Sequence, residues 1–391
     1  MPIAAYGTIW LSLNPGVPGQ WHLHRALTVV LALVSTVTIF DVWKDLGRSS
    51  RIAVALCMLV TLESIFWLPA ETTDARRAFA QAVGALGASS VILVIAGSQR
   101  RLVHLLRGLV LAALVISAVA LVEWRTGLHL ETLAGRPWPT GAALGATFVN
   151  PNNFAAHTVV LVGVLLVTAH ARSGWGRLLL FSGLLLGALS LLTFSRTALL
   201  ALALTGTVLI SLRARGRFSE IVPKVVILAL LAVIAAMATN FLDHFSEGVY
   251  FDGSSQSNQL RLEIAKRAIL ALIQSVGFGI GPGAFEASQS VSGNVLTITN
   301  IHNSFLEVAV AYGAVPAALL LLLVFTVLKS AWQGLGTHPS LAALSLFALG
   351  SALLGGLTAS SILADPGWWL ELALAAVLAD VASSSEASGE S

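Results

Sequence analysis

The sequence has 391 residues, of which 56% are hydrophobic and 10% are charged, and its mean hydropathy is +0.85. Soluble globular proteins carry about 25% charged residues, so this composition excludes an ordinary soluble protein and predicts an all-α, polytopic transmembrane helical bundle. The net charge of +3 predicts no nucleic-acid partner, because the basic excess of a membrane protein usually lies in its cytoplasmic loops.

Apolar stretches long enough to cross a bilayer as a helix, roughly 20 residues each, recur through the chain, and they predict about 11 spans within a range of about 10 to 12. The predicted spans are 24–41, 52–69, 78–97, 104–122, 153–170, 177–194, 197–212, 222–240, 303–328, 340–362 and 367–380. Residues 3–13 are too short to cross alone and are expected to be interfacial or re-entrant. The single cysteine, Cys57, excludes an internal disulfide.

These spans predict one integral-membrane domain over residues 1–382. Within it, residues 241–302 form one large loop that contains an amphipathic helix, and residues 303–380 hold the C-terminal spans. Residues 383–391 are acidic and rich in serine, and they are expected to be a disordered tail.

Lysine and arginine are unevenly divided between alternate loops. Thirteen of the 22 lie in one set of loops and nine in the other, and three of those nine lie in the long 241–302 loop, where charge counts less. The positive-inside rule therefore places the first set and the C-terminus in the cytoplasm, and the 241–302 loop on the outer face. With this topology nearly all polar residues in unusual places lie outside: Arg125, Arg136, Asn150, Asn152, Asn153, His157, Arg196, Arg261, Arg267, His302 and Asn303.

Three asparagines surround Pro151 at the outer start of the fifth predicted span. The Asn-Pro pair favours a turn, and Asn152 or Asn153 would cap the helix that follows. Capping accounts for one asparagine but not readily for three, so Asn150 and Asn153 are candidates to support a functional site.

Arg196 is the only charge in the apolar run 178–212, which is too long for one span and barely long enough for two. The turn must therefore fall near Ser195 and Arg196, which holds the guanidinium at the membrane boundary. The alternative is an interfacial arginine that extends toward water. An arginine suits a phosphate or diphosphate ligand, because its planar fork donates two hydrogen bonds and stays charged.

The predicted helix from about residue 258 to 275 carries an apolar stripe at helical spacing, made of Leu260, Ile264, Ala268 and Leu272. Arg267 lies four residues after Glu263, so a surface ion pair is at least as good an explanation for it as a ligand contact. Arg261 has no comparable partner and is the stronger candidate for binding an anionic group.

Glycines 277, 279, 281 and 283 alternate along the turn that follows this helix. Such a turn allows the backbone to approach a ligand closely, and a phosphate cradle and an ordinary turn are equally good interpretations.

His302 and Asn303 precede the ninth predicted span. Ser304 and Glu307 fit the capping-box pattern, which explains them structurally, although Glu307 could instead orient His302. His302 has no such explanation, and because its ordinary pKa is about 6.5 it can accept a proton at neutral pH, so it is the candidate catalytic base.

Five segments together resemble the O-antigen ligase family, which also includes polysaccharide polymerases and bacterial protein O-oligosaccharyltransferases. The segments are Phe148–Phe154, Ser195–Thr197, Arg261 with its helix, Gly277–Phe285 and His302–Pro316. The most specific feature is His302-Asn303, followed by nine residues and then Gly313. Pro316 departs from the pattern, because relatives commonly have Gly, Thr or Tyr there. The resemblance covers roughly residues 140 to 330.

The resemblance implies a GT-C-like fold and an inverting glycosyl transfer, independent of metal and cofactor, at the outer face of a bacterial inner or plasma membrane. The implied donor is a glycan on polyprenyl (undecaprenyl) diphosphate, and the acceptor is a hydroxyl of a glycolipid, a glycan or a protein. Arg196 and Arg261, with Arg267 and Asn303, would hold the donor, and His302 would activate the acceptor. Supporting roles are implied for Asn150, Asn153, Gly279, Gly281 and Glu307.

Among these activities the His-Asn spacing favours a ligase over a polymerase or a protein glycosyltransferase. A transporter or flippase for lipid-linked glycans could use the same arginines, but it would be expected to place polar groups in both halves of the membrane and often to show an inverted repeat. A peptidoglycan-type polymerase would be expected to need a catalytic carboxylate, for which Asp243 and Asp252 are the only obvious candidates.

Overall fold

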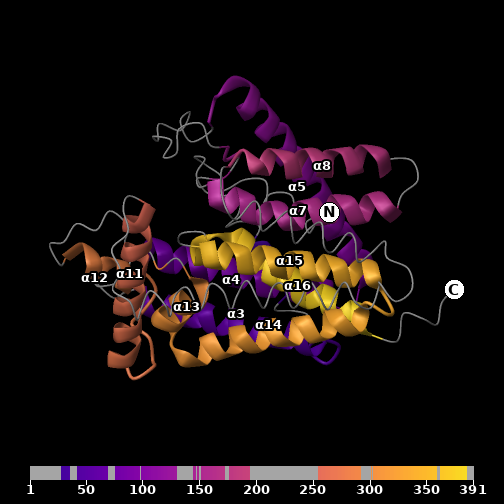
Figure 1. Ribbon diagram of the computed structural model, residues 1–391. Coiled ribbons are helices and arrows are strands. Elements are labelled where there is room, and N and C mark those ends of the chain that lie inside the picture. Colours follow the sequence, from indigo (N-terminus) through magenta and orange to yellow (C-terminus); the bar gives the residue numbers. More distant parts are fainter. Residues whose placement is uncertain are drawn as a thin grey trace.

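The computed structural model describes residues 28–35, 42–68, 75–96, 98–129, 144–146, 148, 151–171, 176–193, 254–291, 301, 303–358 and 362–384. Every regular element in these ranges is helical, which confirms the predicted all-α class for the part described (Figure 1). The elements are α3 (Arg48–Trp67), α4 (Ala75–Ile95), α5 (Gln99–Thr126), α7 (Pro151–Ala171), α8 (Gly176–Leu191), α11 (Ser254–Gln274), α12 (Ala284–Val291), α13 (Ser304–Tyr312), α14 (Ala314–Gly334), α15 (Pro339–Thr358), the 3-10 turn η1 (Ile362–Ala364) and α16 (Pro366–Ser383).

Six of the described helices are long and apolar enough to cross a membrane: α3, α4, α5, α7, α14 and α15. These six support a polytopic membrane protein, and α8 is a shorter apolar helix of 16 residues at the sixth predicted span. The predicted spans at 197–212 and 222–240 lie outside the described residues, as does most of the span at 24–41. The total of eleven spans therefore stays a prediction.

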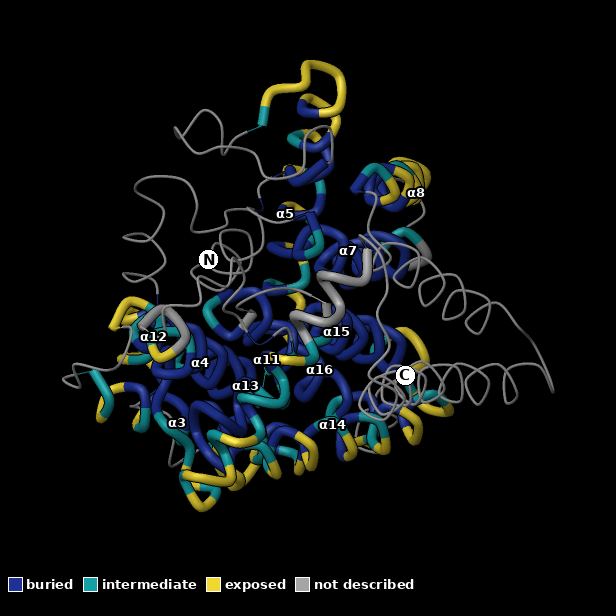
Figure 2. Tube along the Cα trace, turned by 60° about the vertical axis from the view of Figure 1, so that its left-hand side comes forward, coloured by how far each residue is buried: buried dark blue, intermediate teal, exposed yellow. Residues whose placement is uncertain are grey.

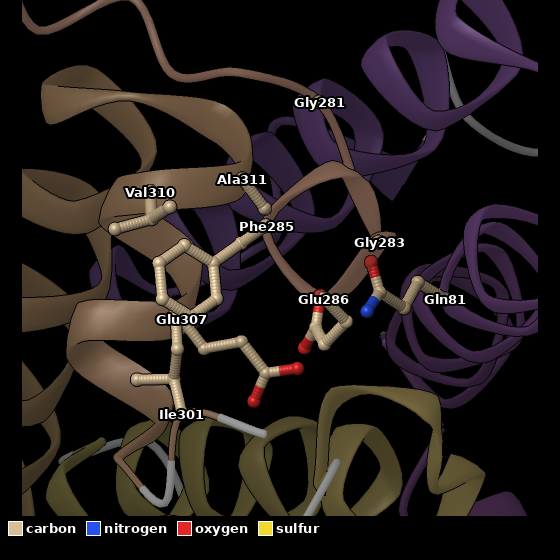
Figure 3. A pocket seen from close by; sticks show the side chains of 9 residues that line it. All are labelled: Gln81, Gly281, Gly283, Phe285, Glu286, Ile301, Glu307, Val310 and Ala311. Atoms are coloured by element: carbon tan, nitrogen blue, oxygen red, sulfur yellow. The ribbon is translucent and has the colours of Figure 1, made fainter. Parts of the chain in front are cut away.

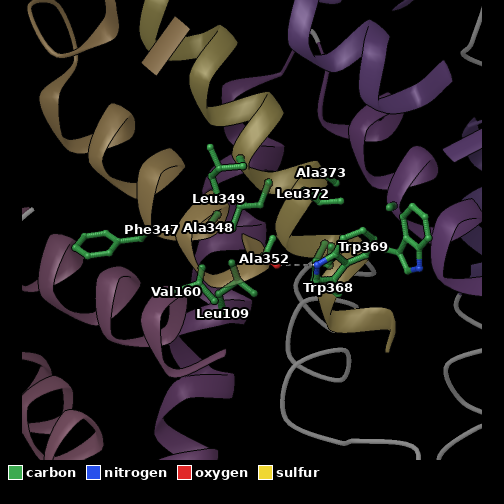
Figure 4. Packing of buried hydrophobic residues seen from close by; sticks show 14 of the residues in the cluster. Leu109, Val160, Phe347, Ala348, Leu349, Ala352, Trp368, Trp369, Leu372 and Ala373 are labelled. Carbon is green, nitrogen blue, oxygen red and sulfur yellow. Dashed lines mark hydrogen bonds between the residues drawn. The ribbon is translucent and has the colours of Figure 1, made fainter. Parts of the chain in front are cut away.

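Helix α16 lies at the centre of the bundle, where it contacts α3, α4, α14 and α15. Nearly every residue of this helix is buried, including both tryptophans, Trp368 and Trp369, as expected for a helix that is apolar on all sides (Figure 4). The two indole N–H groups donate to the backbone carbonyls of Ala352 and Leu363, both at 2.8 Å. Figure 2 shows α16 and α4 largely buried, whereas α14 carries exposed turns at the edge of the bundle.

The last turn of α16 also supplies the cap that the start of α3 lacks. Gly47 precedes α3 and has no side chain to accept from its first amides. The carboxylate of Asp380 accepts from the Ser49 amide at 3.2 Å and from the Ser50 amide at 2.7 Å. A negative charge at a helix N-terminus is favourable, so this contact fixes α3 against α16.

The predicted span at 303–328 is wrong as one continuous helix, because the structure divides it into α13 and α14 at Gly313. Gly313 has φ +89° and ψ −176°, a conformation that only glycine adopts readily. Its Cα also faces the backbone of Gly277 and Phe278, so that an added Cβ would lie 2.6 Å from the Gly277 carbonyl oxygen. The hydropathy of the run continues through the break, so hydropathy alone could not reveal it.

Helix α11 lies across one end of the bundle, with α12 beside it (Figure 1). It occurs where the sequence predicts an amphipathic helix, and Ile264 and Ala268 of the predicted stripe are buried against α13 together with Val310. The stripe therefore holds α11 on the helix that begins just after His302.

Candidate functional site

Asn303 forms the N-cap of α13. Its side-chain oxygen accepts from the Leu306 amide at 3.1 Å, and its backbone is extended. Ser304 is the first helical residue, so the predicted capping box between Ser304 and Glu307 is wrong. The pattern misled because Asn303, a good capping residue itself, stands one position earlier. Glu307 therefore does not cap the helix. It is nevertheless buried, with only 5% of its surface exposed.

The glycine turn packs on the opposite end of α13. The amides of Ile280 and Gly281 donate to the carbonyls of Val310 and Ala311 at 2.8 and 3.1 Å, which satisfies carbonyl groups that the end of a helix leaves unpaired. Gly279 has φ +80°, and its Cα faces the backbone of Ala311 and Gly313. The turn therefore needs its glycines for close backbone contact with α13.

A small polar recess lies between the glycine turn, α13 and α4. It is a shallow hollow with room for about one water molecule, and Ile301 forms part of its wall. The carboxyl groups of Glu286 and Glu307 and the amide of Gln81 face it (Figure 3). Glu307 has one carboxyl oxygen, Oε2, that is buried and has no hydrogen-bond partner among the described residues.

Two contacts from α3 and α4 hold the polar side chains of the recess. Arg77 forms an ion pair with Glu286, with 2.6 Å between Nη1 and Oε1. The Tyr312 hydroxyl donates to the side-chain oxygen of Gln81 and accepts from Ser64 at 2.8 Å. Both of these chains of contacts connect the first half of the sequence to the segment around His302.

The surroundings of Glu307 disfavour ionisation of its carboxyl group. Burial raises the pKa of the Glu307 carboxyl well above its ordinary value of 4.5; the neighbouring Glu286 carboxylate raises it further, and Arg77 lowers it. The recess therefore presents the Glu307 carboxyl group, the Gln81 amide and the ion-paired Glu286 carboxylate. Such a set suits hydroxyl groups or water.

Helix α7 begins at Pro151, so Asn152 and Asn153 lie inside its first turn, and the prediction that one of them caps the helix is wrong. A proline is favoured at the first helical position, because it has no amide hydrogen to leave unpaired. Asn153 is buried, and its side-chain oxygen has no partner among the described residues. His157, one turn later on the same face, is completely buried.

His157 lies between two carboxylates of the C-terminal region. Its Nδ1 is 2.6 Å from Glu371 Oε1, and its Nε2 is 3.1 Å from Asp365 Oδ2. The Ser351 hydroxyl donates to the same oxygen of Glu371 at 2.5 Å, and Phe148 stacks on the imidazole with 5.0 Å between the ring centres. Sequence reasoning noted His157 but could not find its partners, because more than 200 residues separate it from both Glu371 and Asp365.

The segment before α7 is held by a buried carboxylate of α5. Glu123 accepts from the Gly145 amide at 3.0 Å and from the Ala146 amide, and its Oε1 is 2.5 Å from His129 Nδ1. The Leu144 amide donates to the Leu192 carbonyl at 3.0 Å. Phe148 is thereby fixed over His157, close to the end of α8 that leads toward Arg196.

The other predicted site residues have different outcomes. Arg267 forms the expected ion pair with Glu263, with 3.0 Å between Nε and Oε1, at the surface of α11. Arg261 lies in α11, but its side chain is outside the described part of the structure, and His302, Arg196 and Asn150 are outside it altogether. The structure thus brings together Gly281 and Glu307 in one recess, with Asn303 on the same helix as Glu307.

Among the residues that the structure describes, no three His, Cys, Asp or Glu side chains are grouped as a metal site requires.

Comparison with protein families shows that residues 181–322 match the family model described as O-antigen ligase. The match contains the glycine turn, α11, α13 and the Arg196 and His302 positions. A search among curated proteins found no match.

We expect Glu307→Gln to change how stability depends on pH. Because the pKa of Glu307 is higher in the folded state than in the unfolded state, the wild-type protein loses stability as pH rises above about 5, by up to about 1.4 kcal/mol per pH unit, until the folded-state pKa is reached. Glutamine keeps the shape and cannot ionise, so the variant should gain stability relative to wild type over this range. Thermal unfolding in detergent between pH 5 and 9 measures this, and parallel curves would contradict the assignment.

We expect His157→Leu to destabilise the protein by about 3 to 5 kcal/mol, because Glu371 and Asp365 both lose the imidazole and keep, among the described residues, only their contacts with Ser351 and Gly367. In His157→Leu/Glu371→Leu one of those carboxylates is gone, so the double variant should be more stable than the single one. His104→Leu, at a half-buried histidine on α5, is the control and should change stability by less than about 0.5 kcal/mol. Unfolding in detergent measures all three, and a double variant less stable than His157→Leu would argue against a coupled cluster.

Proposed function

We propose, because residues 181–322 match the family model described as O-antigen ligase, that the protein transfers a glycan from a polyprenyl diphosphate to an acceptor hydroxyl. The family assignment, together with six helices able to span a membrane, supports a membrane glycosyltransferase of the ligase or polymerase type in a bacterial inner membrane. The donor, the acceptor class and the roles of single residues are the parts that we propose here.

The proposed donor site contains fixed positive charge. A diphosphate leaving group gains negative charge in the transition state, and arginines stabilise it most when they are already positioned there. We assign this role to Arg196 and Arg261, with Asn303 in support. Arg267 is a weaker candidate than it was on sequence grounds, because its guanidinium already pairs with Glu263.

The proposed catalytic base is His302, which takes the proton of the acceptor hydroxyl as that hydroxyl attacks the anomeric carbon. Attack from the side opposite the diphosphate inverts the configuration at this carbon. The support comes from its neighbours in the chain: Ile301 forms a wall of the polar recess, and Asn303 caps α13. Glu307 and Gln81 could then bind sugar hydroxyls, with no metal in the proposed reaction.

One observation carries this proposal: a single matched segment contains every proposed donor and catalytic residue. Within it the structure holds α11, the glycine turn and α13 together through the contacts of Ile280, Gly281 and Ala268. Asn150 and Asn153 lie before the match and support the site only through the start of α7. We place the reaction at the outer face, from the charge distribution of the loops, and we favour a ligase-type acceptor.

We expect His302→Ala to lower glycan transfer by about 100- to 10,000-fold, because a positioned base contributes that much to such a step. The measurement is transfer in vitro by purified protein, with lipid-diphosphate glycan and a lipid-linked core, a second glycan and a serine peptide as alternative acceptors. Protein recovered from membranes and its unfolding temperature control for folding. Full transfer by the variant would remove His302 from the mechanism, and loss of wild-type activity in EDTA would contradict a metal-independent reaction.

We expect Arg196→Ala and Arg261→Ala to weaken use of the donor by about 10- to 100-fold each, the value of about 1.5 to 3 kcal/mol for a hydrogen bond to a charged group. Arg267→Ala is the matched comparison on the same helix as Arg261 and should lose much less. The measurement is kcat/KM for the donor at saturating acceptor. Equal losses for Arg261→Ala and Arg267→Ala would show that the two arginines have the same role.

A further inference from the structure

Four large apolar side chains are exposed at the C-terminal end of α11 and in the turn that follows. Leu270 and Ile273 lie on the last two turns of the helix, and Val276 and Phe278, each 82% exposed, follow it. We call these four residues the apolar tip. So much apolar surface in water is unfavourable by about 25 cal/mol for each Å², so a contiguous group of this kind indicates a surface that something else covers.

The backbone at the tip is strained in a way that keeps a large side chain exposed. Val276 has φ +53°, in the left-handed region that β-branched residues rarely occupy. Glycine adopts this region readily, and glycines do so at positions 277, 279, 281 and 283 of the same turn. A valine at 276 therefore stabilises neither the turn nor the protein core, which points to a role for its side chain outside the protein.

The apolar tip is continuous with the exposed face of α14. The Ala314 amide donates to the Gly277 carbonyl at 2.8 Å, so the turn is attached to the first residue of α14. From there exposed apolar side chains continue along the helix: Val315, Leu321 and Phe325. Because α14 is long and apolar enough to cross a membrane, we expect its exposed apolar face to contact lipid.

The exposed face of α11 changes character along the helix. Its middle carries the ion-paired Glu263 and Arg267. Leu270 lies seven residues after Glu263, which is about two turns or 10 Å further along nearly the same face. The helix thus has a charged half and an apolar half, as does a helix at a membrane surface with one end deeper than the other.

We propose that the apolar tip inserts among the acyl chains of the bilayer beside the start of α14. The bilayer is the occupant that the structure favours, since the tip extends the exposed apolar face of a helix able to cross the membrane. Insertion holds the glycine turn, and with it the recess around Glu307, at the boundary of the membrane. This inference does not depend on the proposed reaction.

The test uses introduced cysteines, which is possible because the single natural cysteine of the chain is buried. Cys57 is only 3% exposed, so a cysteine introduced at the surface can be labelled selectively. Phe278→Cys and Val276→Cys, labelled with an environment-sensitive fluorophore, are placed in nanodiscs of phosphatidylethanolamine and phosphatidylglycerol. Glu263→Cys, on the charged half of the same helix, is the matched control. Nitroxide-labelled lipids quench a fluorophore among acyl chains, and iodide quenches one in water.

We expect both tip variants to be quenched severalfold more by nitroxide lipids than by iodide, with emission at shorter wavelength than the Glu263→Cys control, which should show the reverse. Quenching of the tip by iodide would overturn the proposal, and so would protection from both quenchers, which would mean that protein covers the tip. If labelling disturbs folding, the same question can be tested on unmodified protein in nanodiscs. A carbene precursor dissolved in the lipid then labels the parts of the protein that lie among the acyl chains. The 270–278 peptide should then carry more label than the 258–267 peptide, and equal labelling would overturn the proposal.

Discussion

The carboxylates of one buried helix must each find hydrogen-bond donors on other elements, and much of the described arrangement follows from this. Inside a membrane protein no bulk water is present to satisfy a polar group, so an unpaired carboxylate is costly. Helix α16 and its cap carry three: Asp365 and Glu371 face the two nitrogens of His157, and Asp380 accepts from the first amides of α3. In addition to its apolar contacts, α16 is thus joined to α7 through His157, to α15 through Ser351 and to the start of α3 through Asp380.

The same region connects the buried cluster to the recess. The 3-10 turn η1 comes just before Asp365 and contacts both α4 and α13, which form walls of the recess. On α15, Ser351 bonds Glu371, while Gly356 faces Ser304 at the start of α13 so closely that a Cβ there would collide with it. The position of α13, and with it that of Asn303 at its start, therefore depends on how α15 and α16 pack in the bundle.

The sequence predicted the elements of this arrangement better than their partners. The described helices fall close to the predicted spans, since hydropathy over a window of a span's length is a strong signal. The buried stripe of Ile264 and Ala268 and the pair between Glu263 and Arg267 also followed from helical spacing. The break at Gly313 was missed because it lies inside an uninterrupted apolar run, and the Asn303 cap because Ser304 offered a competing pattern. The pairing of His157 with Glu371 could not be predicted, because His170 and Asp380 lie in the same two predicted spans and were equally good candidates to pair.

The link between α3 and α16 also bears on how the chain is assembled. Ser49 and Asp380 are 331 positions apart, so α3 enters the membrane long before its capping carboxylate has been synthesised. Because the helix that fills the centre of the bundle is among the last described elements to be made, the earlier helices must wait beside the insertion machinery with their inner faces unfilled. Assembly of this protein is thus a late event governed by contacts distant in the chain, and the interval before it is when the nascent protein is most exposed to mispairing and to quality-control proteases.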